Sequence, residues 1–233
     1  MARSTRVDDV VEFIIGAIES GRFPIGEQLP GEEQLAKLAD ASRLTLREAV
    51  KTLAAHRVLN PVQGRGTFVN PPAMWLSLEA LMRVQEGNHV DALLQLVEVR
   101  GFLEIGATER FARVARPEQV AELRSHLDAM VAANARGDVE SVMEADLAFH
   151  QVIIDGSGNP YIAAAMAPLA RVLAEARRAT SGVPEIRANA IAEHTKVLEA
   201  ISRGDAPAAR KAMRSHMRQT ADDTRLHLAS PSA

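Results

Sequence analysis

Residues 42–69 have the sequence SRLTLREAVKTLAAHRVLNPVQGRGTFV, in which a helical pattern is followed by a hairpin pattern. The helix is predicted by four apolar residues at helical spacing, Leu46, Ala49, Val50 and Leu53. Thr45–Glu48 fits a capping box at its start. The hairpin is predicted by two short β-like runs around a glycine-rich tip at 63–66. Apolar periodicities at 7–18 and 35–39 predict two earlier helices, so this part of the chain has the outline of a winged helix-turn-helix.

Basic residues lie along one face of the predicted third helix. Arg43, Arg47 and Lys51 recur every four residues, opposite the apolar face. The segment 42–66 carries five basic side chains and one acidic side chain. In a winged helix-turn-helix the third helix enters the major groove of DNA by its N-terminal end, and an arginine there can bind guanine through two hydrogen bonds. The spacing alone is equally consistent with a solvated basic face.

The predicted hairpin offers a second contact with DNA. Gly64 and Gly66 flank Arg65, so the backbone can approach a duplex while the arginine reaches a phosphate or the minor groove. The residues predicted to contact DNA are Arg43, Thr45, Arg47, Lys51, Arg65 and Gly66. The positive charge is local, because the whole chain has 27 Lys and Arg against 30 Asp and Glu, a net charge of −3.

The composition restricts the other possibilities. Hydrophobic residues make up 47% of the 233 residues and aromatic residues only 3%, so aliphatic side chains and alanine must form the core, which favours helices over a β-sandwich. The absence of cysteine excludes disulfides, thiolate zinc sites and cysteine nucleophiles. The first residues show no export signal, and no apolar run is long enough for a membrane span. We therefore expect a soluble, cytoplasmic protein.

Two consecutive prolines, Pro71 and Pro72, predict a domain boundary. We expect a DNA-binding domain at 1–72 and a second domain at 73–233. The second domain is helical by its apolar period and shows no strand signal. Helix-breaking residues predict about seven helices, with breaks at 86–90, 116–117, 136–138, 156–160, 181–184 and 204–207. The predicted fold class is mainly α, a winged helix-turn-helix followed by an all-α bundle.

Three histidines, His150, His194 and His216, fall on apolar faces of the predicted helices. Imidazole is costly to bury unless its nitrogens are hydrogen-bonded or bind a metal. Asp146 precedes His150 by four residues, so the carboxylate and the imidazole project from one helical turn. With two histidines from other helices they would form an N₃O set suited to zinc or another divalent first-row metal. The same pattern is also consistent with histidines that are hydrogen-bonded in a core.

Arg100 falls on the apolar stripe of its predicted helix. A guanidinium among aliphatic side chains needs an anion, and its planar fork suits a carboxylate. That carboxylate could belong to Glu104 or Glu98, or to a bound ligand. A metal with open positions beside an arginine would select a small carboxylic acid, and a hydroxylated acid could chelate the metal.

Ordered motifs over residues 7–70 resemble the winged-helix domain of the GntR family of regulators. These motifs are GEQLP at 26–30, LA at 35–36, SR at 42–43, REA at 47–49 and QGRGTFV at 63–69. Gly31 and Glu33 stand where the family commonly has serine and arginine, and Leu44 replaces a usual small polar residue. We therefore expect the DNA contacts of these three positions to differ from those of the family.

Residues of about 90–225 resemble the FCD effector domain of FadR-like GntR regulators. The motifs are DLAFH at 146–150, SGNP at 157–160, EH at 193–194, LEAI at 198–201, GD at 204–205 and His216. The resemblance implies that Asp146, His150, His194 and His216 bind a divalent metal, with Zn²⁺ first and Ni²⁺ or Mn²⁺ as alternatives. It implies that Arg100 faces an effector cavity. Because one small reading module offers few base contacts, we expect a homodimer on palindromic double-stranded DNA. The metal beside Arg100 predicts that a small carboxylate effector controls it.

The sequence thus predicts a transcription regulator, acting as a repressor, and not an enzyme. The rival from another class is a metal-dependent hydrolase whose Asp/His₃ site activates water. The chain lacks a His-Glu-x-x-His motif, and Glu193, the one carboxylate close to His194 in sequence, does not face the same way on a helix. A structural metal in an interaction domain is the third possibility.

Overall fold

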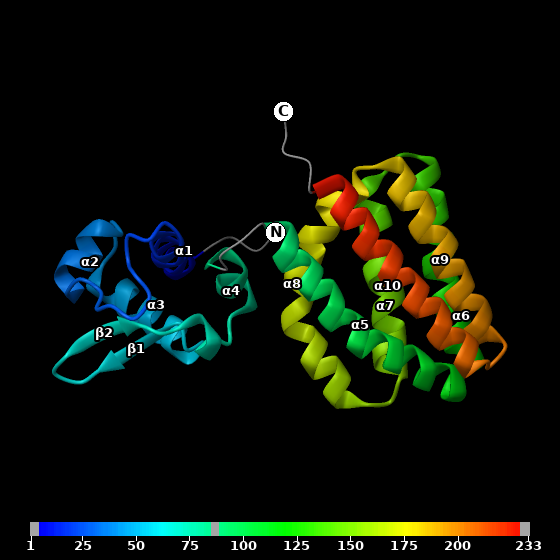
Figure 1. Ribbon diagram of the computed structural model, residues 1–233, viewed down its shortest axis with the longest axis horizontal. Coiled ribbons are helices and arrows are strands. Elements are labelled where there is room, and N and C mark those ends of the chain that lie inside the picture. Colours follow the sequence, from blue (N-terminus) through cyan, green and yellow to red (C-terminus); the bar gives the residue numbers. More distant parts are fainter. Residues whose placement is uncertain (1–4, 85–88, 229–233) are drawn as a thin grey trace. The chain divides into compact units, whose positions relative to one another are not determined.

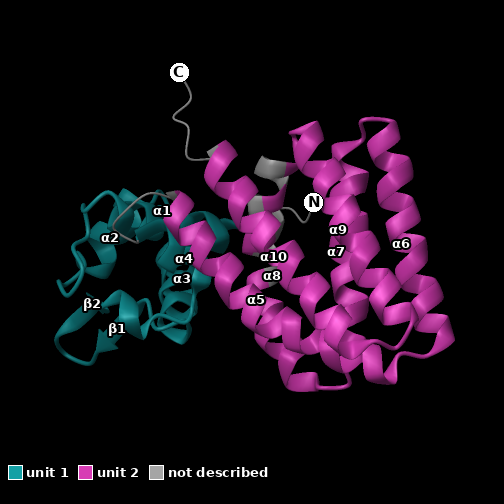
Figure 2. Cartoon of the chain, turned by 45° about the vertical axis from the view of Figure 1, so that its right-hand side comes forward, with its two compact units in different colours: residues 1–89 teal, residues 90–233 magenta. Residues whose placement is uncertain are grey.

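The computed structural model describes residues 5–84 and 89–228. It divides into two compact units, Met1–His89 and Val90–Ala233 (Figure 2). Over the described residues the chain forms ten α-helices, one short 3₁₀ helix and a two-stranded sheet (Figure 1). The predicted mainly α fold with a small wing is confirmed. Among the described helices none is both long and apolar enough to cross a membrane.

The first unit has the predicted order of three helices and a hairpin. Its elements are α1 (Arg6–Glu19), α2 (Glu32–Leu38), α3 (Arg43–Ala55), β1 (Leu59–Val62), β2 (Gly66–Val69), η1 (Pro72–Met74) and α4 (Leu78–Val84). The two strands pair antiparallel, with Leu59 opposite Val69. The predicted apolar faces of α1 and α3 meet in one core, where Ile14 and Leu46 are completely buried. This core fixes α3 with its opposite, polar face outward.

The start of α3 differs from the expected capping box at Thr45–Glu48. Ser42 is the N-cap, and its hydroxyl accepts a hydrogen bond of 3.1 Å from the backbone N–H of Thr45. The helix therefore begins at Arg43, before the predicted box. The reason is that serine, like threonine, caps well, and the residue with extended backbone at this junction is Ser42.

The tip of the wing requires glycine. Gly66 has a φ of 107°, a conformation that L side chains rarely adopt. A Cβ atom there would also collide with the side chain of Gln28. The role of Gly66 that the structure supports directly is therefore to shape the wing around Arg65.

Residues 73–84 belong to the first unit, so the division does not fall at the expected 72/73 boundary but at His89 and Val90. Trp75 is buried, and its indole N–H donates a 2.8 Å hydrogen bond to the carbonyl of Asn70. Helix α4 packs against α1, and Arg83 forms ion pairs of 2.7 Å with both Glu12 and Glu19. The two prolines end the wing, but the residues that follow them still contribute Trp75 and Ala80 to the core of the first unit. The break expected at 86–90 falls largely on residues 85–88, which lie outside the described residues.

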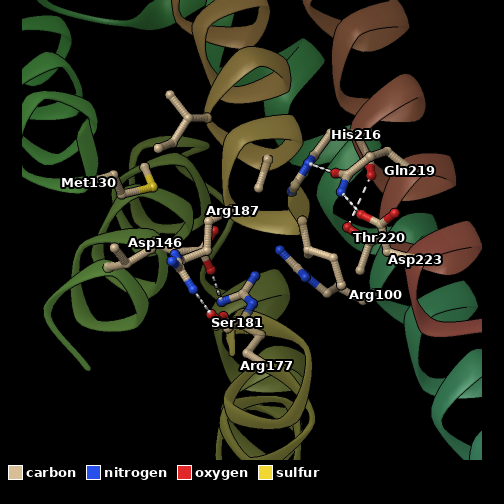
Figure 3. Close-up of a pocket in the computed structure, with 14 residues that line it drawn as sticks. Arg100, Met130, Asp146, Arg177, Ser181, Arg187, His216, Gln219, Thr220 and Asp223 are labelled. Atoms are coloured by element: carbon tan, nitrogen blue, oxygen red, sulfur yellow. Dashed lines mark hydrogen bonds and ion pairs between the residues drawn. The ribbon is translucent and has the colours of Figure 1, made fainter. Parts of the chain in front are cut away.

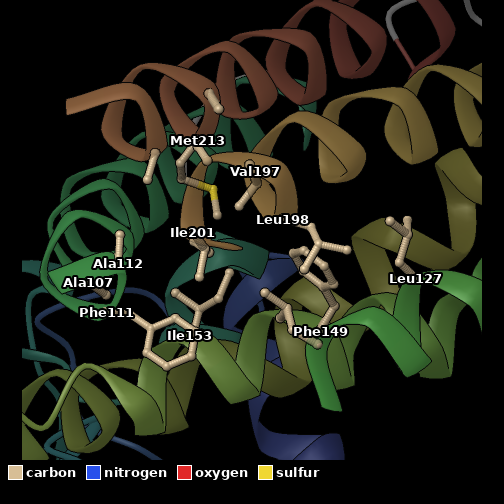
Figure 4. Close-up of a cluster of buried hydrophobic side chains, with 14 of the residues drawn as sticks. Ala107, Phe111, Ala112, Leu127, Phe149, Ile153, Val197, Leu198, Ile201 and Met213 are labelled. Carbon is tan, nitrogen blue, oxygen red and sulfur yellow. The ribbon is translucent and has the colours of Figure 1, made fainter. Parts of the chain in front are cut away.

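The second unit is an all-α bundle, and its helices end where the glycine and proline breaks predict. They are α5 (His89–Val114), α6 (Pro117–Ala135), α7 (Val139–Gly156), α8 (Pro160–Ser181), α9 (Pro184–Ser202) and α10 (Ala206–Leu228). Sequential helices α6 and α7, α7 and α8, and α9 and α10 pack together, and α6 also packs against α9. Phe111, Phe149 and Leu198 are among the buried side chains that fill the centre (Figure 4). This core holds α7, α9 and α10 at fixed positions around the site described next.

Candidate metal centre and nucleic-acid interface

The structure brings the four predicted metal ligands together from three helices. Asp146 and His150 stand on α7, His194 on α9 and His216 on α10. Each offers one ligand atom, and these atoms all lie within 4.8 Å of one another. The three histidines are almost completely buried, with exposed fractions of 3% for His150, 0% for His194 and 3% for His216. The predicted spacing within α7 and the packing of α9 and α10 therefore produce one compact cluster.

Each histidine has an oxygen atom close to its Nδ1 atom. These are the Ala190 carbonyl oxygen for His194 (2.6 Å), Gln219 Oε1 for His216 (3.2 Å) and Glu104 Oε2 for His150 (2.5 Å). The last is an ion-pair contact and not a linear hydrogen bond. An acceptor at Nδ1 favours the proton there, so the neutral ring presents its lone pair at Nε2. All three rings therefore direct an unprotonated Nε2 to the cluster.

The candidate ligand atoms of these four residues crowd together at short distances. His194 Nε2 lies 3.0 Å from Asp146 Oδ1 and 3.1 Å from His150 Nε2. His216 Nε2 is buried and has no hydrogen-bond partner within the described part of the chain. Atoms that carry lone pairs repel at such distances, and a proton on one ring would relieve only some of the contacts. One metal ion would satisfy all four atoms, since tetrahedral ligands at about 2.0–2.1 Å from zinc lie about 3.3 Å apart.

The protonation states also suit a divalent cation. Burial lowers the pKa of His150 to about 3 and lowers the pKa of His216 well below its usual value, so both rings are neutral. Burial by itself would raise the pKa of Asp146, but Arg177 and the neighbouring histidines hold it well below its usual value. The cluster therefore offers one carboxylate and the neutral imidazoles of His150 and His216, and with the ring of His194 this set fits zinc and other divalent first-row metals.

Arg100 lies beside this cluster and has the internal partner that the sequence offered. It is 1% exposed, and its Nε donates to Glu104 one helical turn away on α5. Its Nη2 donates a 2.8 Å hydrogen bond to Nε2 of His150. Glu98, the other proposed partner, is exposed, and no hydrogen bond or ion pair joins it to Arg100 among the described residues. Arg100 is thus held between a carboxylate and one of the candidate metal ligands.

An open cavity with about 530 Å³ of empty space adjoins the cluster (Figure 3). Polar side chains from five helices line it, among them Arg100, Asp146, Arg177, Arg187, His216 and Gln219. The rest of the wall is apolar and includes Met130 and Ile186. Three arginines line this cavity, and their positive charge suits a small organic acid.

Three residues of this cavity were not predicted from the sequence. Arg177 forms a 2.8 Å ion pair with Asp146 Oδ2. Arg187 donates to Asn134 Oδ1 (2.8 Å) and to the Ser181 carbonyl. Helical spacing could have found Arg187, two turns before His194, and Gln219, one turn after His216. No local signal indicates Arg177, because its role depends on how α8 packs against α7.

The predicted DNA-binding face of α3 is exposed, and each of its basic side chains has an acidic partner. The pairs are Arg43 with Glu33 (3.1 Å), Arg47 with Glu32 (2.8 Å) and Lys51 with Glu48 (2.8 Å). Exposed ion pairs contribute at most about 1 kcal/mol each, so phosphates or bases can replace these partners at small cost. The acidic Glu33, where the family commonly has arginine, places negative charge next to this face.

The other predicted DNA contacts take different positions. Thr45 is half-buried, and its hydroxyl lies 2.8 Å from the hydroxyl of Ser42. Arg65 stands at the wing tip, 5.9 Å from the ring of Phe68. Leu44, in the first turn of α3, is 72% exposed. An apolar side chain so exposed, between Arg43 and Thr45, is out of place unless something covers it.

Two family models match this chain. Residues 6–69 match the model described as "Bacterial regulatory proteins, gntR family", and residues 95–219 match the FCD domain. The chain belongs to the GntR family. Its FCD domain coincides with the helical unit that carries the Asp/His₃ cluster, and FCD domains commonly bind metal.

This GntR protein is similar to curated regulators over almost its whole length. It is 29% identical over 213 residues to the galactonate operon transcriptional repressor of Escherichia coli, covering 89% of this chain and 91% of the relative. It is 27% identical over 217 residues to a putative L-lactate dehydrogenase operon regulatory protein of the same species, covering 90% and 83%. These relatives are transcription regulators and not enzymes, so the alternative of a metal-dependent hydrolase is not favoured.

A solved structure shares the fold of this GntR protein. It is described as Lar, which controls expression of the Listeria monocytogenes agr system, and the two superpose with a TM-score of 0.69. The match covers 96% of this chain and 98% of the other at 20% identity. At this identity the likeness supports the fold alone.

Proposed function

We propose that this protein is a FadR-like GntR repressor whose affinity for its operator is controlled by a small carboxylic acid bound beside a divalent metal. Zn²⁺ is the first candidate, and Ni²⁺ or Mn²⁺ are alternatives. The observation that carries the proposal is the convergence of Asp146, His150, His194 and His216 in one buried cluster, next to the buried Arg100. When bound, such an ion supplies open positions that an acid can ligate.

An acid with a hydroxyl group next to its carboxylate fits this site best. The carboxylate can pair with Arg100, and the hydroxyl gives a second atom for chelation. Two relatives carry names that refer to galactonate and L-lactate, and both of these are 2-hydroxy acids. The polar side chains of the cavity, including Gln219 and Arg187, can accept or donate hydrogen bonds to further hydroxyl groups.

On the DNA side, we assign base reading to the first turns of α3 and backbone contact to the wing. Arg43 and Arg47 leave their ion pairs with Glu33 and Glu32 and bind DNA instead. Leu44 packs against the methyl group of a thymine in the major groove. Arg65 reaches a phosphate or the minor groove. Thr45, Lys51 and Gly66 complete the predicted contact set. A regulator of this kind acts in the cytoplasm, where the chromosome is.

A homodimer follows from the small size of one reading module. One winged helix offers few base contacts, and two-fold related copies on a palindromic operator double them. On the second unit, Phe102 of α5 is 74% exposed beside a groove that α5 forms with α10. Glu98 and Arg218 line the same groove, so a second copy related by two-fold symmetry can pair Glu98 with Arg218 and bury Phe102.

The test begins with an operator selected from random DNA by the purified protein. The affinity for this operator is then measured with Zn²⁺ and with galactonate, L-lactate or propionate, the last of which lacks the hydroxyl group. We expect one of the hydroxy acids to weaken operator binding only when Zn²⁺ is present, and propionate to have little effect. If no Zn²⁺ binds, or if DNA binding shows no sequence preference, the proposal is wrong.

A further inference from the structure

We infer that Arg100 and the metal ion compete for one atom, Nε2 of His150, and that the guanidinium becomes available to an acid only after it has left that atom. This inference rests on the proposed metal site and concerns the order in which the site is filled. It assigns to Arg100 a role besides pairing with the acid, because the same side chain restrains metal binding.

The competition follows from the number of lone pairs on the ring. His150 Nδ1 lies 2.5 Å from a carboxylate oxygen of Glu104, which favours the proton at Nδ1. The single remaining lone pair of the ring is at Nε2, and the Nη2 atom of Arg100 donates to it at 2.8 Å. That nitrogen cannot accept from Arg100 and ligate a metal at the same time. Arg100 must therefore move before His150 can join Asp146, His194 and His216 as a ligand.

Because Arg100 is buried, its guanidinium needs a new hydrogen-bond acceptor once it has left His150. Arg100 is 1% exposed, so water cannot replace the lost partner freely. One carboxylate oxygen of Glu104 already accepts a hydrogen bond from Nε of Arg100. The other oxygen of Glu104 lies 3.4 Å from Nη2 of Arg100. A buried donor left without an acceptor is costly. A carboxylate in the cavity that Arg100 lines would supply the acceptor, so loading of the cluster prepares the site for the acid.

The two other arginines of the cavity do not have this relation to a ligand lone pair. Arg177 contacts Asp146 through Oδ2, whereas Oδ1 of the same carboxylate faces His194 at 3.0 Å. Among the described residues Arg187 donates to Asn134 and to the Ser181 carbonyl, and neither is a candidate ligand. Arg187 is nevertheless 7% exposed and lines the same cavity. Its removal therefore takes one buried positive charge from the site without freeing a ligand atom.

The experiment measures the affinity of the full chain for Zn²⁺ alone, by competition with a chromophoric chelator. Four proteins are compared: wild type, Arg100→Met, Arg100→Lys and Arg187→Met. We expect Arg100→Met to bind Zn²⁺ about tenfold more tightly than wild type or better, as expected for the loss of one charge-assisted hydrogen bond. Arg100→Lys should also bind more tightly, because one ammonium cannot hold Glu104 and reach His150 as the guanidinium does.

The charge-conserving variant and the Arg187 variant separate competition from simple repulsion. We expect Arg187→Met to remain within about threefold of wild type. Equal gains for Arg187→Met and Arg100→Met would show that charge alone matters and would overturn the inference. An unchanged or weaker Zn²⁺ affinity in Arg100→Lys would also overturn the inference. Arg100→Lys retains a cation to pair with Glu104, so it can still be measured if Arg100→Met does not fold. If wild type itself binds no Zn²⁺, the proposed metal site fails, which is a distinct result.

Discussion

Arginine–glutamate pairs occur in both units, but in opposite surroundings. On α3 the side chains of Arg47 and Glu32 are 60% and 48% exposed, whereas those of Arg100 and Glu104 in the helical bundle are 2% and 1% exposed. An exposed pair is weak and screened by salt, so a polyanion can replace its acidic member readily. A buried pair cannot lose one partner without leaving a costly charge behind. The exposed surface of α3 can therefore exchange its acidic partners readily for DNA. The buried site accepts only a ligand that gives Arg100 a new partner in place of the one it loses.

The largest effect should come from removing a ligand of the buried cluster. We expect His194→Ala to lose stoichiometric Zn²⁺ and with it the stabilisation that Zn²⁺ gives the folded protein. That stabilisation is about 2.7 kcal/mol when free Zn²⁺ exceeds its dissociation constant a hundredfold. Elemental analysis and thermal unfolding with and without Zn²⁺ measure both quantities. His227→Ala, an exposed position on α10, is the control. Stoichiometric metal in a variant that lacks His150, His194 and His216 together would refute the site.

A smaller loss should follow when a ligand stays but its support is removed. The amide oxygen of Gln219 accepts a hydrogen bond from Nδ1 of His216. The amide nitrogen of Gln219 donates to Asp223, and this second hydrogen bond fixes the orientation of the amide. Gln219→Leu should weaken Zn²⁺ binding about 10–100-fold, because His216 loses the acceptor that orients its ring. Gln219→Glu keeps an acceptor and should bind much closer to wild type. Chelator competition gives the affinities, and equal values for Leu and Gln at this position would contradict the assigned role.

On the exposed surface we expect a comparable change in specificity with no change in folding. Arg47→Ala should cost about 1–3 kcal/mol of operator binding and relax the preference at one base position in each half-site. Arg65→Ala should weaken all sequences evenly and lower the salt dependence. Titrations of operator and random duplexes at two salt concentrations measure these effects. An unchanged ratio of operator to random affinity in Arg47→Ala would mean that α3 does not read bases through Arg47.

The smallest effect concerns a single methyl group. If Leu44 packs on a thymine, replacing that thymine by uracil in the operator removes the methyl group and should weaken binding about fourfold, as one buried methylene contributes about 0.8 kcal/mol. Leu44→Ser should lose this sensitivity while keeping most of its affinity for DNA. Binding of wild type and Leu44→Ser is measured on operators in which thymines are replaced one at a time. A wild type indifferent to every replacement would exclude the contact.

The same contrast between surface and interior explains how much could be predicted from the sequence. Helix ends in the second unit follow from glycine and proline, which act locally, and the four clustered residues follow from helical spacing and the family resemblance. The first unit extends past Pro72 because Trp75 packs into a core formed by distant residues, and no local pattern encodes this. The pairs of α3 with Glu32 and Glu33 and the contact of Arg177 with Asp146 likewise join different helices, so only the packed structure reveals them.

The positions of the four clustered residues have a consequence for unfolding. A chain with no cysteine has no disulfide, yet one ion held by α7, α9 and α10 would cross-link residues 146 to 216. Because an ion that binds only the folded protein is lost when the cluster opens, opening any one of these helices would also cost the binding free energy of the ion. Three helices would then open as one cooperative segment, and hydrogen exchange of their backbone amides would report one shared free energy of opening. The cluster would thus set how the helical bundle comes apart as well as what it binds.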